Sequence, residues 1–264
     1  MGQRTVIFGA GESGVGAAIL AQKEGYEVFV SDAATIKPDY KKRLNDHGIE
    51  WEEGGHTNEK IENADEIVKS PGIPNHIPLI QRLLDRKIPV ISEIELAGRY
   101  TDAKIIGITG SNGKTTTTML TYHILQNAGL NVGLAGNVGN SLALQVAESP
   151  KDYYVVELSS FQLENMYDFK VNIAVLLNIT PDHLDRYHDD FNEYVDAKFR
   201  IIRNQTPDDA FIFWQDDPVV REGIEKYQPK ATLYPFSETY QPESKGYVKN
   251  GTIIIESLNG IFNM

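Results

Sequence analysis

Residues 107–117 read GITGSNGKTTT, and this stretch decides the fold of the second half of the chain. An apolar run at residues 104–109 precedes the second glycine and predicts a buried strand, and residues 115–127 are compatible with a helix. A strand, a glycine-rich turn and a helix together form a phosphate-binding loop, because backbone N–H groups and the helix N-terminus can contact phosphate oxygens. The sequence therefore predicts a nucleotide-binding loop here.

The loop departs from the strict pattern G-x-x-x-x-G-K-[ST] at one position. Ile108 stands where the pattern has glycine, and Gly110 supplies the glycine instead. We expect Lys114 to reach the terminal phosphates of a nucleotide and the Thr115 hydroxyl to bind Mg²⁺. The alternative, a chance glycine-rich turn, is disfavoured because strand, turn, Lys-Thr pair and helix all come in order. The residues expected to hold ATP are Gly110, Ser111, Asn112, Gly113, Lys114, Thr115 and Thr116.

The composition of the 264-residue chain limits the class of protein. With 41% hydrophobic and 23% charged residues, it suits a soluble globular protein of about two domains. The formal net charge of −12 disfavours non-specific binding to nucleic acids or anionic membranes. No cysteine is present, which excludes disulfides and thiolate sites. Neither a signal-peptide pattern nor a long apolar run occurs, so we expect a cytoplasmic protein.

A second glycine motif lies near the N-terminus. Residues 5–8 predict a strand, residues 9–14 read GAGESG, and residues 15–24 predict a helix. The next predicted strand covers residues 27–31, and Asp32 follows it directly. This places an acid about 20 residues after the glycines, as in dinucleotide-binding folds. A nicotinamide or flavin cofactor fits this pattern, and so does another diphosphate ligand, which we favour.

Alternating strand and helix signals continue along the chain and predict mostly parallel sheets. A helix that begins near Ser92 marks a junction, so we expect a Rossmann-like domain at residues 1–93 and a P-loop-type mononucleotide-binding α/β domain at residues 94–264. Residues 247–249 and 252–255 flank Asn-Gly and predict a small antiparallel β addition, a hairpin, near the C-terminus.

Three predicted strands of the second domain lead to polar residues. One leads to the phosphate loop, one ends at Glu157, and one leads to Asp182 and His183. Because ligands of open α/β sheets lie beyond the carboxyl ends of the strands, we expect one assembled site. Glu157 fits either a Mg²⁺ ligand, which we favour, or a cap of the next segment. His183 fits a metal ligand, a phosphate-orienting group or an exposed loop histidine.

Two further positions have ordinary explanations from pattern alone. Lys198 lies inside a predicted helix at residues 190–203, where a surface lysine is the default. Asn137 lies in a tight loop, where asparagine is common for turn reasons.

Three motifs, taken together, indicate one protein family. Residues 109–116 read TGSNGKTT, residues 157–164 read ELSSFQLE, and residues 182–187 read DHLDRY. These motifs resemble those of the Mur ligase family, including the departure from the strict loop pattern, and within it the member that adds D-glutamate. The resemblance implies an ATP-dependent ligase of peptidoglycan biosynthesis. Its substrates would be UDP-N-acetylmuramoyl-L-alanine, D-glutamate and ATP, and its intermediate an acyl phosphate.

The resemblance also implies roles for the candidate residues. The first domain would hold UDP rather than NAD, and the second would hold ATP with two Mg²⁺ ions. Implied substrate-binding residues are Glu12, Ser13, Asp32, Ser70, Pro71, Gly72, Asn137 and Ser159. Implied metal ligands are Thr115, Glu157, His183 and Lys198, the last after carbamylation by CO₂, and implied catalytic residues are Lys114, His183 and Lys198.

The resemblance also raises an expectation about the length of the chain. Family members carry a third, C-terminal domain that supplies the D-glutamate pocket, and this chain ends before it. We therefore expect a monomeric N-terminal fragment that binds the UDP-sugar without turnover. Two other classes stay open: a non-catalytic nucleotide-binding module, and an NAD(P)-dependent oxidoreductase fused to an ATPase. The second lacks a recognisable catalytic pair in the first fold.

Overall fold

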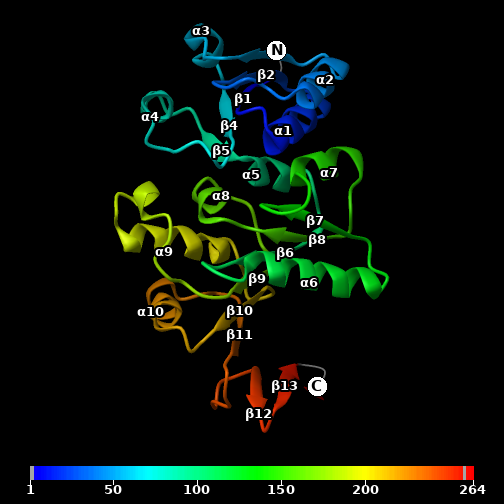
Figure 1. Ribbon diagram of the computed structural model, residues 1–264, viewed down its shortest axis with the longest axis vertical. Coiled ribbons are helices and arrows are strands. Elements are labelled where there is room, and N and C mark those ends of the chain that lie inside the picture. The colour runs from blue at the N-terminus through cyan, green and yellow to red at the C-terminus, as the bar shows by residue number, and fades with distance from the viewer. Residues whose placement is uncertain (1–2, 258–259) are drawn as a thin grey trace.

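The computed structural model describes residues 3–257 and 260–264, which form two α/β halves stacked along the long axis (Figure 1). The first half is built on a five-stranded parallel sheet with the order β3-β2-β1-β4-β5. This is the strand order of a dinucleotide-binding fold. Its strands are β1 (Arg4–Phe8), β2 (Glu27–Asp32), β3 (Glu50–Glu53), β4 (Glu66–Lys69) and β5 (Val90–Ser92).

Helix α1 (Glu12–Lys23) packs on this sheet with residues 14–21 all buried. The glycine turn that precedes it is tight, and Gly9 has a φ of +90°. A Cβ on Gly14 would lie 1.8 Å from the Gly9 carbonyl oxygen, so only glycine fits where the helix meets the turn. The other helices of this half are α2 (Pro38–Asp46), α3 (Asn58–Ile61), α4 (Pro78–Asp85) and α5 (Glu93–Gly98).

The second half is built on a nine-stranded sheet with the order β14-β13-β12-β11-β10-β9-β6-β8-β7. Neighbouring strands are parallel from β7 across β8, β6, β9, β10 and β11 to β12. The pairs β12–β13 and β13–β14 are antiparallel. The strands are β6 (Lys104–Thr109), β7 (Val132–Gly136), β8 (Tyr153–Glu157), β9 (Ile173–Leu176), β10 (Ala210–Trp214), β11 (Thr232–Phe236), β12 (Gly246–Lys249), β13 (Thr252–Ser257) and β14 (Gly260–Asn263). The helices are α6 (Lys114–Asn127), α7 (Leu142–Glu148), α8 (Ser160–Glu164), α9 (Phe191–Phe199) and α10 (Pro218–Tyr227), with 3₁₀ turns η1 (Leu184–Tyr187) and η2 (Arg200–Ile202).

The predicted fold class is confirmed. A parallel Rossmann-like sheet is followed by a P-loop-type sheet with a small antiparallel part. The predicted hairpin is β12–β13, and its turn residues Asn250 and Gly251 have φ values of +51° and +77°, as the right-handed twist of a two-residue hairpin requires. The third antiparallel strand, β14, was not expected from the sequence.

Other details differ from the sequence-based expectations. The helix predicted at residues 190–203 ends as α9 at Phe199 and tightens into the 3₁₀ turn η2, a common way for a helix to close. The boundary predicted between residues 93 and 94 falls at the start of α5, between the two sheets, and stays a prediction. Within the described residues, no helix combines the length and apolar character needed to cross a membrane.

Helix α5 joins the two halves through two buried glutamates. The Glu95 carboxylate accepts hydrogen bonds from the backbone N–H groups of residues 167, 168 and 169, at 2.9, 3.0 and 2.9 Å. The Glu93 carboxylate accepts from the Ser141 hydroxyl and the Ala143 N–H, both at 2.6 Å. Burial raises the pKa of Glu93 to about 7. These bonds fasten the second half onto the helix that ends the first.

Substitution of Glu95 tests this attachment. In Glu95→Gln, an amide N–H₂ replaces one carboxylate oxygen and faces backbone N–H donors that then lack an acceptor. We expect the free energy of unfolding to fall by about 3 kcal/mol. Urea denaturation followed by circular dichroism measures it. Glu62→Gln, which alters an exposed carboxylate paired with Arg86, is the control and should change stability by less than about 1 kcal/mol. Equal stability of the two variants would contradict the assigned role.

Candidate functional site

The phosphate loop, residues 110–113, connects β6 to α6. Gly110 has a φ of +154° and Gly113 a φ of +83°, so the turn depends on glycine at both ends. Gly113 is the N-cap of α6, and Lys114, Thr115 and Thr116 form its first turn. The first N–H groups of a helix have no partner within it, and together with the helix dipole they favour an anion at this end.

Residues that follow β9 hold this loop in place. The Asn178 side chain accepts a hydrogen bond from the Asn112 N–H at 2.8 Å and donates one to the Asn112 carbonyl at 3.1 Å. The Ser111 hydroxyl donates to the Thr180 carbonyl at 2.8 Å and accepts from the Thr180 N–H at 2.9 Å. The side chains of Ser111 and Asn178 therefore shape the loop. Asn178 was not assigned to the site from the sequence, although it directly follows a predicted strand.

Two lysines meet at the Gly110 carbonyl. The Lys114 ammonium donates to the carbonyls of Gly110 and Ser111, each at 2.9 Å. Lys198 reaches the Gly110 carbonyl from α9 at 2.8 Å. Its side chain is 1% exposed, which excludes the surface-lysine interpretation. Burial, and then the nearby charge of Lys114, lower the pKa of Lys198 to about 7.

Glu157 ends β8, the strand next to the one that carries the loop. One of its carboxylate oxygens accepts from the Asn137 amide at 2.8 Å, and its carbonyl accepts from the Asn137 N–H at 3.0 Å. The other oxygen is buried, and no described group of the protein hydrogen bonds to it. A buried carboxylate oxygen without a partner is unfavourable, and a hard cation such as Mg²⁺ would satisfy it.

His183 lies apart from these groups in its contacts. It has a φ of +51° at the start of η1, its side chain is 58% exposed, and its ring centroid is 5.3 Å from that of Phe161. No hydrogen bond, ion pair or ring contact within the described chain joins it directly to Glu157 or Lys198. Within residues 3–257 and 260–264, no three His, Cys, Asp or Glu side chains are grouped for metal binding. Of the four implied metal ligands, Glu157 and His183 belong to these residue types, and the other two are Thr115 and Lys198.

A cavity of about 210 Å³ draws its walls from both halves of the molecule. From the first half come Glu12, Ser13 and Pro71, and from the second comes Asn137, so four implied substrate-binding residues meet here. The other lining residues, for which the sequence alone predicts no role, are Gly136, Gly139, Ser141 and Gln162.

The remaining implied substrate residues have structural partners. Asp32 accepts from the N–H groups of Ala10 and Ala34 at 2.7 and 2.8 Å, so it stabilises the first glycine turn. The Ser70 hydroxyl is 3.5 Å from the Gly9 carbonyl of that turn. The Ser159 side chain caps α8 by accepting from the N–H three residues later at 3.3 Å. An S-x-x-Q capping pattern is readable from sequence and explains Ser159 without a ligand.

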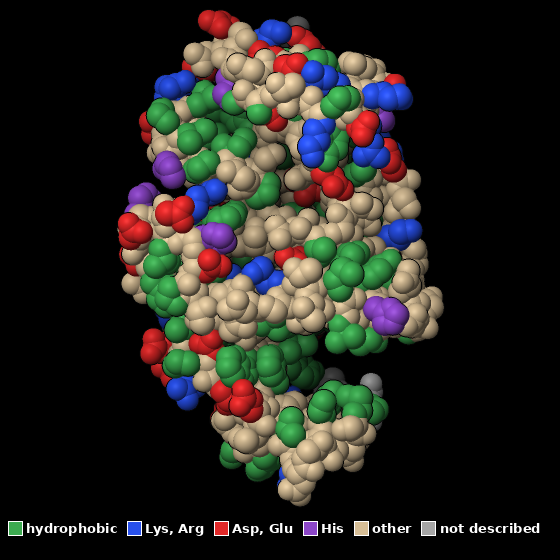
Figure 2. All heavy atoms as spheres, in the orientation of Figure 1, with side chains coloured by type: hydrophobic (Ala, Val, Ile, Leu, Met, Phe, Trp, Pro, Cys, Tyr) green, Lys and Arg blue, Asp and Glu red, His purple; other side chains and the backbone are tan. Residues whose placement is uncertain are grey.

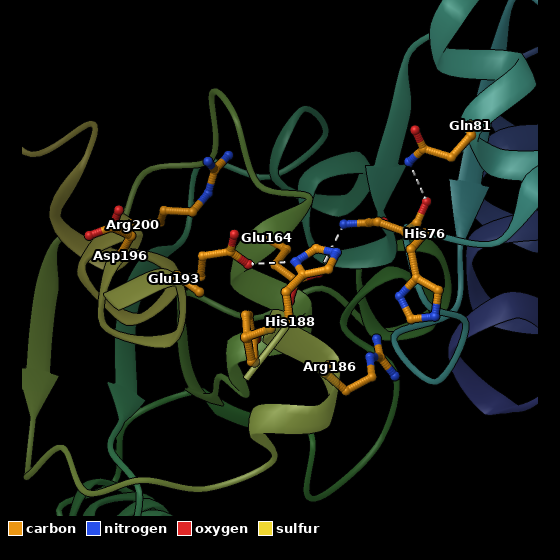
Figure 3. A pocket seen from close by; sticks show the side chains of 11 residues that line it. His76, Gln81, Glu164, Arg186, His188, Glu193, Asp196 and Arg200 are labelled. Carbon is orange, nitrogen blue, oxygen red and sulfur yellow. Dashed lines mark hydrogen bonds and ion pairs between the residues drawn. The ribbon is translucent and has the colours of Figure 1, made fainter. Parts of the chain in front are cut away.

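A larger cavity, of about 690 Å³, lies elsewhere, between the segment before α4 and the helices α8 and α9 (Figure 3). Histidines and charged residues line it, including His76, Glu164, Arg186, His188, Glu193 and Arg200. Figure 2 shows basic, acidic and histidine side chains gathered on this face of the molecule. A hydrogen bond to Glu193 and its charge raise the pKa of His188. No sequence pattern had indicated this cavity.

Comparison with known families decides the class of protein. Residues 108–257 match the Mur ligase middle domain, and residues 4–77 match the MurD N-terminal domain. The chain belongs to the Mur ligase family. The matches cover both glycine turns, so the ligase resemblance inferred from three motifs is confirmed.

Curated relatives of this Mur ligase chain include enzymes named UDP-N-acetylmuramoylalanine--D-glutamate ligase. The relative from Bacteroides fragilis is 62% identical over 253 residues, which are 96% of this chain and 57% of the relative. That from Porphyromonas gingivalis is 56% identical over 261 residues, which are 98% of this chain and 58% of the relative. The chain thus spans somewhat over half the length of these relatives.

Solved structures share the fold of this Mur ligase chain. A UDP-N-acetylmuramate:L-alanyl-gamma-D-glutamyl-meso-diaminopimelate ligase from Neisseria meningitides has a TM-score of 0.65 at 19% identity, with 99% of this chain and 86% of that chain covered. A murein peptide ligase from Psychrobacter arcticus has a TM-score of 0.63 at 19% identity, with 100% of this chain and 61% of that chain covered. At such identities the likeness concerns the fold alone.

The buried amine of Lys198 predicts a pH-dependent stability. Its pKa is about 7 in the folded chain against 10.5 in the unfolded one, so wild type loses stability as the pH falls from about 10 towards 7. Lys198→Met removes this titration. When the pH is lowered from 10 to 7, the free energy of unfolding of the variant should rise by about 4 kcal/mol relative to that of wild type.

Urea denaturation at the two pH values, in CO₂-depleted buffer, measures the difference. Lys42→Met, at a side chain that is 75% exposed, controls for the loss of one lysine. A stability difference between Lys198→Met and wild type that is the same at both pH values would show that the amine is not desolvated as described.

Proposed function

We propose that this chain carries the UDP-sugar and ATP sites of an ATP-dependent ligase that adds D-glutamate to UDP-N-acetylmuramoyl-L-alanine. The observation that carries the proposal is a cavity formed by both halves and lined by Asn137, which hydrogen bonds to Glu157 on the strand next to the one that carries the phosphate loop. It occurs in a chain 62% identical to a ligase of that name. Because the chain spans 57% of that relative, the reaction is proposed for the whole protein, and the experiments test the binding steps. We expect the protein to act as a monomer in the cytoplasm, where both nucleotides are available.

The two glycine turns would bind different phosphates. The Gly9–Gly14 turn, with Glu12 and Ser13, would hold the UDP diphosphate, and the uridine would lie near Asp32 and the turn at residues 70–72. The match of residues 4–77 to a MurD N-terminal domain favours this ligand over a nicotinamide cofactor. Asn137 and Ser159 would contact the muramoyl-alanine part.

The phosphate loop would bind ATP and support the first chemical step. The L-alanyl carboxylate oxygen attacks the γ-phosphorus, ADP leaves, and an acyl phosphate forms. The amine of D-glutamate then attacks the acyl carbon and displaces phosphate. The N-terminus of α6 would hold the phosphates, and Lys114 would exchange its carbonyl partners for the transferred group, neutralising its charge.

Two Mg²⁺ ions, when bound, would screen the charge on the phosphates and orient the transferred group. The residues we propose to hold them are Thr115, Glu157, His183 and carbamylated Lys198. The unpartnered buried oxygen of Glu157 fits a cation, and the low pKa of Lys198 leaves a neutral amine that can react with CO₂. The His183 side chain is exposed and, in the described part of the chain, makes no contact with the other three residues, so it would have to turn toward them to bind a metal ion.

Removal of the Lys114 ammonium tests the nucleotide site. Lys114→Ala should weaken binding of a non-hydrolysable ATP analogue with Mg²⁺ by at least about tenfold, because a charged phosphate contact is lost. Binding of UDP-N-acetylmuramoyl-L-alanine should change by less than about twofold, and NADH should not bind. Calorimetric titration measures all three ligands.

The control for this experiment is Lys104→Ala, which removes an exposed lysine at the start of β6. It should leave all three affinities as in wild type. Tight binding of NADH in place of the UDP-sugar, or unchanged ATP-analogue binding to Lys114→Ala, would refute the proposed function.

Carbamylation of Lys198 can be observed directly. In ¹³C-labelled bicarbonate the wild-type chain should show one carbamate carbon resonance, which weakens as the pH falls below about 7 because the amine becomes protonated. Lys198→Met should lack it, and Lys42→Met should keep it. A resonance that survives in Lys198→Met would assign the modification to another lysine.

A further inference from the structure

Arg186 contacts the first half of the molecule from η1 in the second. Its guanidinium donates to the carbonyls of Gly72 and Pro71 at 3.2 and 3.3 Å. The same group lies 4.2 Å from the centre of the Phe161 ring. Figure 3 shows Arg186 extending toward the loop of the first half at the edge of the large cavity. A planar fork that binds two carbonyls while stacking on a ring is a geometry specific to arginine.

The turn that Arg186 holds is a wall of the smaller cavity. Pro71 lines that cavity together with Glu12, Ser13 and Asn137. Gly72 is exposed, and the neighbouring Ser70 hydroxyl makes a long hydrogen bond of 3.5 Å. Backbone hydrogen bonds within the first half hold the two ends of the turn, from the Ser70 N–H to the Phe8 carbonyl and from the Ile73 N–H to the Ser70 carbonyl, whereas the carbonyls of Pro71 and Gly72 find their partner in the second half. That partner is Arg186.

On its other side, Arg186 begins a row of packed aromatic rings. The Phe161 ring stacks with Tyr187 at a centroid distance of 6.2 Å and an angle of 16°. Tyr187 meets Tyr194 edge to face at 5.4 Å, and both tyrosines are at most 4% exposed. The Tyr194 hydroxyl is 3.0 Å from the Ser111 hydroxyl of the phosphate loop. The row is thus a continuous packed connection from the turn at residues 71–72 to the loop.

We propose that Arg186 is a positioning residue that fixes the Pro71-Gly72 turn on this aromatic row. It thereby couples ligand binding in the smaller cavity to ligand binding at the phosphate loop. The inference rests on the proposed function, since it names the two ligands that are coupled. A ligand that orders the turn also orders the row, so the second ligand meets a loop that is already ordered. The effect must be equal in both directions, because coupling of binding free energies is reciprocal.

The experiment is a calorimetric titration of the 264-residue chain. UDP-N-acetylmuramoyl-L-alanine is titrated with and without a saturating non-hydrolysable ATP analogue and Mg²⁺, and the analogue is titrated with and without the sugar nucleotide. The proteins are wild type, Arg186→Met, Arg186→Lys and the control Arg86→Met. Arg86 pairs with Glu62 on the surface of the first half, with half of its side chain exposed.

We expect each ligand to tighten the binding of the other to wild type and to Arg86→Met by the same factor. In Arg186→Met, binding of the sugar nucleotide alone should weaken by about tenfold, since two charged hydrogen bonds to the turn are lost. Binding of the ATP analogue alone should change by less than about twofold, and the coupling should vanish. Arg186→Lys should behave like Arg186→Met, because an ammonium cannot bind both carbonyls and stack.

The possible results separate two kinds of failure. If wild type does not bind the sugar nucleotide, the proposed function is wrong. If wild type binds both ligands but shows no coupling, or if both Arg186 variants keep wild-type affinity or coupling, the inference about Arg186 is wrong. An equal loss of both ligands with a lowered melting temperature would show a purely structural role for Arg186 and would also overturn it.

Discussion

Two buried carboxylates of the short helix α5, together with the packing of α1 against α7, set the arrangement of the two halves. Glu95 collects three backbone N–H groups of the second half, and Glu93 binds the start of α7. A charge removed from water is tolerated only where such donors surround it, so these bonds define one relative position of the two sheets. This matters for function because the smaller cavity has walls from both halves. Arg186 provides a second attachment, at the turn whose Pro71 lines that cavity.

Within the second half, the order of the strands brings the chemistry together. Strands β9, β6 and β8 are neighbours, so Asn178, the phosphate loop and Glu157 lie at one edge of the sheet. Two lysine side chains converge on the Gly110 carbonyl there, and their mutual repulsion adds to the burial that lowers the pKa of Lys198. A triphosphate would supply the negative charge that this arrangement favours. Charge preorganised in this way is the main means by which proteins promote phosphoryl transfer.

Much of the fold was predictable because it is encoded locally. The strand–turn–helix units and the Asn-Gly hairpin follow from periodicity and turn chemistry over a few residues. Contacts between distant segments were not predictable. Lys198 has the pattern of a surface lysine in its helix, but it is buried and donates to a carbonyl 88 positions earlier, so only the family resemblance indicated a role for it. The contacts of Arg186 cross 114 and 115 positions, and no local pattern indicates such contacts.

We propose that the two glycine turns, one in each half, bind the phosphates of two different nucleotides. A crystal structure of the chain with UDP-N-acetylmuramoyl-L-alanine and a non-hydrolysable ATP analogue tests it most directly. We predict uridine density beside Asp32 and Ser70, diphosphate density at Ser13, and the triphosphate at Lys114. Sugar-nucleotide density in the large cavity beside His188, or a triphosphate bound away from the loop, would contradict the account.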